Sequence, residues 1–250
     1  MCILLSAMPS TGPELLFSIS GLRVSNTLLA TLVVDIVIIL LVVLVRRRLS
    51  LFPGKFQAAV ESIVEYLQTT TQQVAGNRTP LIFPWVAIFF LYIVFSNLIG
   101  LLPGFGTIGF YRETGFVPLL HVSTSDLNLT LALAVVSVVA TNVIAIRTVG
   151  LGMYLRRFFA LNPLLLFVGL LELLQELTKF VTFSFRLFGN ISAGEAVLGT
   201  MSALLAFVVP VPFLAFELLV AVIQGLVFAL LTMAFMTMLT EPHHAEENSK

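Results

Sequence analysis

Charged side chains are scarce in this 250-residue sequence: they make up only 10% of it, whereas soluble domains average about 25%. Hydrophobic residues account for 58%, and the mean hydropathy is +1.06. This composition excludes a soluble globular fold. The 13 basic residues balance the 13 acidic ones, so no general electrostatic field attracts nucleic acid or an acidic partner.

Cysteine and enzyme motifs are nearly absent as well. The single cysteine, Cys2, excludes an intramolecular disulfide and a cysteine metal cluster. Residues 1–20 lack the basic start that precedes the apolar stretch of a cleaved signal peptide. The sequence has no HExxH and no phosphate loop, and its three histidines, His121, His243 and His244, fall outside the apolar spans. We therefore expect no protease, no metal and no cofactor, and interpret the two tail histidines as part of a solvated tail.

Long apolar runs are abundant. A bilayer core about 30 Å thick needs about 20 apolar residues in a helix. The runs predict an all-α polytopic membrane protein with about five membrane helices, forming a single membrane domain over residues 1–250. The predicted segments are a first span at 26–45, a second at 81–102, a third at 127–146, a long helix at 163–209, a last helix at 213–240 and a polar tail at 241–250.

Two connecting segments have a different character. Residues 53–75 carry Lys55 and two glutamates among apolar residues at helical spacing, which is typical of an amphipathic helix on the membrane surface. Residues 104–125 are predicted as a glycine-rich loop. Asp126 and Asn128, which follow it, are interpreted mainly as helix caps, with a channel-lining role as the alternative.

The helix at 163–209 is longer than a bilayer is thick. Its 47 residues would reach about 70 Å at 1.5 Å per residue, more than twice the bilayer core. It therefore has to tilt strongly, lie partly in the membrane plane, or break near Gly189, Gly194 or Gly199. Two prolines at 210 and 212 are expected to end it.

The basic residues predict an orientation. If the arginines after the first span are cytoplasmic, nine of the thirteen basic residues fall on that side. The positive-inside rule then favours an external N-terminus, five passes and a cytoplasmic C-terminus. The lack of a transit peptide favours a bacterial plasma membrane.

Charged residues inside apolar sequence are candidates for function, because they cost several kcal/mol at membrane depth. Glu172, Lys179 and Arg186 are spaced by seven, which places them on one helical stripe within about 40°. Together they form a polar track about 21 Å long. Glu195 lies nine residues beyond Arg186 and faces the opposite side of an unbroken helix. Asp35, alone in the first span, is interpreted as a locally satisfied polar residue.

The last helix carries a matching polar face. Glu217 and Gln224 are seven residues apart, so this face is predicted to pack against the polar side of the long helix, which includes Asn190. Three function classes fit such a cluster: part of an ion path, a scaffold tied together by buried hydrogen bonds, or a secondary transporter that binds a solute at the midplane. The transporter class is weakened because no internal repeat is evident.

The run Phe185–Glu195, FRLFGNISAGE, resembles the signature of subunit a of F-type ATP synthases, the stator subunit beside the rotating c-ring. SDLNLTL at 125–131 also matches, as do Glu172 and Lys179 ahead of the arginine and Gln224 in the last helix. The resemblance covers about residues 53–240. It implies that the last two helices form a steeply tilted hairpin curving around the ring. It also implies partners, namely the c-ring, the subunit b stalk, the other synthase subunits and the lipid bilayer, and no nucleotide site in this chain.

The resemblance also implies roles for single positions. Arg186 is similar to the essential arginine that faces the ion-binding carboxylate of each passing c subunit. Glu172 is similar to the acidic residue of the cytoplasmic half-channel. The remaining positions of the ion-translocation set, mostly around the half-channel open to the other side, match Lys179, Asn190, Glu195, Glu217 and Gln224.

This sequence departs from the family pattern at one point. In many relatives one of the positions matching Glu195 and Glu217 is a histidine, whereas both are carboxylates here. Two nearby acids can share a proton, so a proton path is expected, with a sodium-coupled version as the alternative. The implied function is a pair of offset half-channels that couples ion flow to rotation and ATP synthesis. Arg186, which stays protonated, separates the two half-channels.

Overall fold

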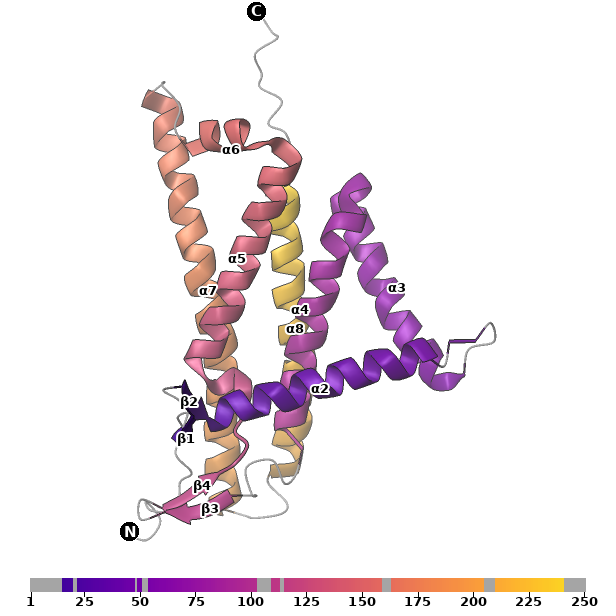
Figure 1. Ribbon diagram of the computed structural model, residues 1–250, viewed down its shortest axis with the longest axis vertical. Helices are drawn as coiled ribbons and strands as arrows, with labels where there is room; N and C mark the ends of the chain where they lie inside the picture. Colours follow the sequence, from indigo (N-terminus) through magenta and orange to yellow (C-terminus); the bar gives the residue numbers. More distant parts are fainter. Residues whose placement is uncertain are drawn as a thin grey trace, which may run out of the picture.

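The computed structural model describes residues 15–19, 22–47, 49–50, 54–102, 109–112, 115–158, 163–204 and 210–240. Helices dominate it (Figure 1), so the predicted all-α class is confirmed. The α-helices are α2 (Asn26–Arg47), α3 (Lys55–Ala75), α4 (Thr79–Gly100), α5 (Leu127–Val149), α6 (Leu151–Phe158), α7 (Pro163–Leu204) and α8 (Pro210–Thr240).

Short elements connect these helices. The 3₁₀ turns are η1 (Gly76–Arg78) and η2 (Ser123–Ser125). Strands β1 (Leu15–Ile19) and β2 (Leu22–Ser25) form one antiparallel pair, and β3 (Gly109–Arg112) and β4 (Gly115–Pro118) form another. The segment predicted as a loop therefore contains a small hairpin and a helical turn in its described part.

In the described part of the chain, four helical stretches are long and apolar enough to cross a membrane, and the chain is a multi-pass membrane protein. They are Asn26–Arg47, Lys55–Gly100, Leu127–Val149 and Val211–Thr240. The stretch Lys55–Gly100 joins α3 and α4 through η1. The prediction of five passes, which adds α7, stays a prediction.

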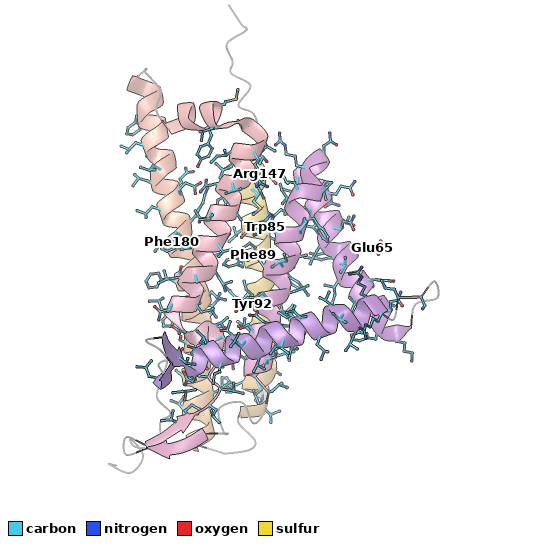
Figure 2. The ribbon with its side chains drawn as sticks, in the orientation of Figure 1. Glu65, Trp85, Phe89, Tyr92, Arg147 and Phe180 are labelled. Atoms are coloured by element: carbon cyan, nitrogen blue, oxygen red, sulfur yellow. The ribbon has the colours of Figure 1, made fainter. Side chains whose placement is uncertain are left out.

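Helices α4, α5, α7 and α8 form the main bundle, and α5 contacts both α7 and α8 (Figure 1). Its core has two clusters. In the first, Ile82, Val86 and Phe90 of α4 pack with Met233 and Met236 of α8. The second is aromatic: Phe89 of α4 and Phe183 of α7 lie against Phe228 of α8, at ring-centroid distances of 5.4 and 4.8 Å. Figure 2 shows Phe89 and Trp85 on α4 within this bundle.

Helix α2 runs crosswise to the bundle (Figure 1). Its first half is anchored by buried residues, among them Ala30 and Val34, whereas Ile36 and Ile39 further along are exposed. An exposed apolar face of this kind suits lipid. Asp35 is half-buried and interacts electrostatically with Tyr92 of α4.

Helix α3 forms an antiparallel hairpin with α4 (Figure 1). Leu67, Thr71 and Ala75 are its buried residues, and they lie at helical spacing on the side that faces the bundle. The opposite side exposes Phe56 and Ile63. This two-sided pattern is the amphipathic helix that the sequence indicates, and its placement on the membrane surface stays a prediction.

Helix α7 is continuous over its 42 described residues and passes through Gly189, Gly194 and Gly199 without a break. It is about 63 Å long, so strong tilt is the alternative that remains. The helix after it begins at Pro210 rather than at the predicted residue 213. Prolines at 210 and 212 fit there because the N–H groups of a first helical turn have no intrahelical partner to lose.

Candidate functional site

Arg186 lies on an exposed face of α7, where Phe185 is exposed as well. Leu187 beside it is fully buried in the aromatic cluster, which fixes the other face of α7 against the bundle. Among the described residues, no side chain or backbone group forms a hydrogen bond or ion pair with Arg186. The structure therefore presents an unpaired guanidinium on an apolar helix surface.

Lys179 has a different environment from Arg186, although the sequence places both on one stripe. Its Nζ lies 2.8 Å from Oε1 of Glu176, one helical turn earlier, and 4.1 Å from the ring centroid of Phe235 in α8. The side chains of Lys179 and Glu176 are partly buried, at 9% and 13% exposure. The polar track is therefore interrupted by a neutralised pair. The side chain of Glu172 is outside the described part of the structure, and its backbone belongs to α7.

The polar faces of α7 and α8 meet at Asn190 and Gln224, as the sequence predicts. Asn190 Nδ2 donates a hydrogen bond of 2.8 Å to Gln224 Oε1. Gln224 is buried, and its Nε2 has no hydrogen-bond partner in the described part of the chain. The pair ties the two helices together at one level and leaves one buried donor available.

Glu217 packs one level further along, against the backbone of Gly194. A Cβ added at Gly194 would overlap the Glu217 carboxylate, so the lack of a side chain there makes room for the acid. Glu217 is 7% exposed, and its Oε2 has no partner among the described residues. Glu195, the next residue of α7, is close enough to Glu217 for the two carboxylates to interact electrostatically. The predicted pairing of the two acids therefore has a physical basis.

Glu195 also meets a residue that the sequence analysis left outside the apolar spans. Nε2 of His121 lies 3.9 Å from Glu195 Oε2 and 3.1 Å from the hydroxyl oxygen of Ser125. His121 comes between β4 and η2, and no helical periodicity links it to α7. The contact follows from the tertiary path of this loop, so no pattern in the sequence could have predicted it.

Asp126 caps α5, which confirms its main predicted role. Its Oδ1 accepts hydrogen bonds from the backbone N–H and the side-chain amide of Asn128, at 2.9 and 3.0 Å. Its Oδ2 accepts a 2.9 Å hydrogen bond from the Thr27 hydroxyl at the start of α2. A further bond of 2.6 Å joins Thr124 to Asn97 of α4. The loop that carries His121 is thus tied to three helices.

The acidic groups and the basic helix ends lie at opposite ends of the bundle. Arg78 at the start of α4 donates a 3.2 Å hydrogen bond to Thr240 at the end of α8. Figure 2 shows Arg147 at that same end, where α5 meets α6. Glu217 lies in the second turn of α8, at the other end. No group of three or more metal-ligating side chains occurs in the described ranges, and His243 and His244 lie outside them.

Comparison with known proteins identifies the family. The model of the ATP synthase A chain family matches residues 27–237. The chain is 34% identical over 211 residues to ATP synthase subunit a 3 of Pelobacter propionicus, covering 83% of this chain and 84% of that protein. It is 32% identical over 215 residues to ATP synthase subunit a of Geobacter sp. (84% and 86% covered), and 29% identical over 217 residues to ATP synthase subunit a 1 of Hahella chejuensis (87% and 85% covered). The chain therefore belongs to the family of subunit a of F-type ATP synthases, the ion-translocating subunit of the membrane sector.

Proposed function

We propose that this chain provides two offset half-channels for protons, separated by Arg186, beside a ring of c subunits. The observation that carries the proposal is the exposed, unpaired guanidinium of Arg186 on an apolar face of α7. Arginine stays protonated in practice, so it can favour the ionised form of a passing carboxylate without relaying a proton itself. A ring carboxylate would give up its proton at this position, and a direct leak between the two half-channels would be blocked.

The external half-channel is built from polar levels along α7 and α8. Glu195 and Glu217 form the outer level, which we call the acid level. The hydrogen-bonded pair of Asn190 and Gln224 forms the next level. Asn190 is about 7 Å along α7 from Glu195, and Arg186 is about 6 Å further. These steps give a proton a series of polar groups from the end of the bundle to the barrier. Asp126 and Asn128 form the rim of this half-channel, with their own hydrogen bonds directed to the α5 cap and to α2.

The cytoplasmic half-channel is assigned to the other part of α7, around Glu172. This residue is about 21 Å along the helix from Arg186, at the end of α7 that leads away from the acid level. Lys179 lies between them and is neutralised by Glu176. We assign Lys179 a wall of this half-channel, because a paired charge does not attract a second ion.

The orientation follows from the charges at the two ends. Arg78 and Arg147 lie at the end of the bundle where α8 finishes. The positive-inside rule assigns that end to the cytoplasm and the acid level to the outside, with the N-terminus external and the C-terminus cytoplasmic. The membrane is a bacterial plasma membrane. The c-ring faces the exposed side of α7, and the subunit b stalk and the remaining synthase subunits complete the complex.

Replacement of Arg186 tests this proposal. In membrane vesicles that contain the whole complex, Arg186→Ala should abolish ATP-driven proton pumping and leave assembly intact. Arg186→Lys should also fail, because a compact ammonium lacks the planar fork and can lose its proton when desolvated. Arg147→Ala is the matched control, since Arg147 is exposed but lies at the end of α5, and it should pump normally. Normal pumping by an assembled Arg186→Ala complex would refute the proposal.

A further inference from the structure

His121 is held against the acid level of the site by two contacts to one ring nitrogen. Its Nε2 lies 3.1 Å from the Ser125 hydroxyl oxygen and 3.9 Å from a carboxylate oxygen of Glu195. The two side chains of the ion pair are 13% and 24% exposed, so the contact is largely shielded. In the part of the chain that the structure describes, no lysine or arginine comes within ion-pair distance of Glu195. Among the described side chains, His121 is thus the cation-forming group in contact with this acid.

The surroundings of His121 leave Glu195 as its acidic partner. From α8, Glu217 lies beyond Glu195, against Gly194. Asp126, which caps α5 at the end of the same loop, already accepts hydrogen bonds at both oxygens, from Thr27 and Asn128. Among the described side chains, Glu195 is therefore the acid in direct contact with the imidazole, and Glu217 acts on it through Glu195.

The loop holds the ring in position. The Ser125 hydroxyl lies 2.8 Å from the Val122 carbonyl oxygen and 3.1 Å from Nε2 of His121, and it also forms a hydrogen bond with Glu195. Thr124 and Asp126, on either side of Ser125, are bonded to α4 and α2 respectively. A ring held in this way keeps Nε2 close to both Ser125 and Glu195 without further ordering.

We infer that His121 is a proton-exchanging residue at the outer mouth of the external half-channel and passes protons to and from Glu195. This inference rests on the proposed function and names an additional residue of its path. Imidazole binds and releases a proton near neutral pH, which a carboxylate freely exposed to water does not do. At 3.9 Å the transfer needs one intervening water or a small side-chain shift, after which a proton leaves imidazolium nitrogen for a carboxylate oxygen. The imidazole, neutral again, takes the next proton from the external water.

The test measures proton flux against external pH in proteoliposomes that contain the whole complex. The native protein should show a step in rate near neutral pH. His121→Gln keeps a hydrogen-bonding side chain but cannot titrate there, so it should lose this step and slow the flux about tenfold. Added imidazole should restore flux in His121→Ala. Leu120→Ala, at the neighbouring half-buried position, is the control for disturbance of the loop and should keep the native profile.

The outcomes separate this inference from the function on which it rests. If Glu195→Gln leaves flux unchanged, the proposed external path is wrong and the role of His121 falls with it. If Glu195→Gln slows flux but His121→Gln keeps the native rate and pH profile, only the role of His121 is wrong. A pH-independent loss in His121→Gln, without rescue of His121→Ala by imidazole, would mean that the residue is structural. Assembly of each variant is checked by co-purification of the c-ring, and His121→Ala with imidazole serves alone if His121→Gln does not assemble.

Discussion

Gly194 makes room for the Glu217 carboxylate by having no side chain. The Glu217 carboxylate occupies the space in which a Cβ of residue 194 would lie, and this brings it close to Glu195. Gly189 and Gly199, in the same helix, have no other atoms within 4 Å of such a Cβ. The same residue type therefore has a steric role at one position of α7 and none at two others.

Gly194→Ala should slow proton flux severalfold, because Glu217 has to move away from Glu195. Gly199→Ala is the matched control. Both changes raise the helix propensity of α7 by about 1 kcal/mol, so a difference between them reports the steric clash alone. Flux is measured in proteoliposomes at equal amounts of assembled complex. Equal rates for the two variants would show that the position of Glu217 does not matter.

Glu195→Gln and Glu217→Gln should each slow proton flux substantially. Two carboxylates close together in a low-dielectric site cannot both ionise at low cost. One of them therefore holds a proton that it can transfer to the next group of the half-channel. Replacement of either acid with histidine should be tolerated, because imidazole also titrates near neutrality. Flux against pH for each variant is the measurement. If one Gln variant keeps the native rate and profile, that residue serves only to anchor α7 to α8.

Residue-level prediction from the sequence succeeded where one helix sets the geometry. The spacing of Glu217 and Gln224 predicts their common face, and a residue such as Asp126 before an apolar helix predicts a cap. It missed His121, because the contact with Glu195 joins a loop to a distant helix. Glu176 was missed for a different reason: it lies three residues before Lys179, off the seven-residue spacing that drew attention to the stripe.

At the scale of elements, α7 and α8 are joined by polar contacts near one end and by a charged pair and aromatic rings further along. Lys179 bridges the two parts, since it pairs with Glu176 in its own helix and lies over Phe235 of α8. A neutralised pair in this position can stabilise the packing without providing a mobile charge. Helix α7 thus combines a segment that packs against α8, around Lys179, with the exposed segment around Arg186.

Glu176→Gln should destabilise the protein by about 3 kcal/mol, because loss of one partner leaves a buried charge unpaired. The double variant Glu176→Leu with Lys179→Met should recover most of this loss, since an apolar pair of similar size avoids the unpaired charge. Thermal unfolding of the purified complex in detergent measures both. If the double variant is as unstable as the single one and also loses pumping, Lys179 has a role beyond packing.

The helix bounds show what hydropathy does and does not determine. The predicted third span, residues 127–146, begins where α5 begins, because a cap marks that residue. The three glycines of α7 do not break it, since a membrane environment penalises unsatisfied backbone groups and keeps the helix continuous. The prolines at 210 and 212 start α8, because position within a helix decides whether proline is tolerated. The strand pairs depend on pairing across turns and were not predicted.

At the scale of the whole molecule, charge is separated along the bundle. Arg78 and Arg147 lie at the end where α8 finishes, and Glu195 and Glu217 with His121 lie at the other end. Arg186 comes between them on a helix about 63 Å long, in a bilayer core of about 30 Å. In the proposed function, a tilted α7 can therefore present Glu172 and Glu195 to different sides of the membrane while its apolar face lies against lipid and the proposed c-ring.

Labelling from the two sides of the membrane tests this arrangement most directly. Single cysteines at Glu172 and Glu195, introduced after Cys2 is replaced by serine, are treated with an impermeant thiol reagent in right-side-out and inverted vesicles of the assembled complex. We predict that Glu172→Cys reacts only from the cytoplasmic side and Glu195→Cys only from the opposite side. Reaction of both cysteines from one side alone would contradict two offset half-channels separated by Arg186.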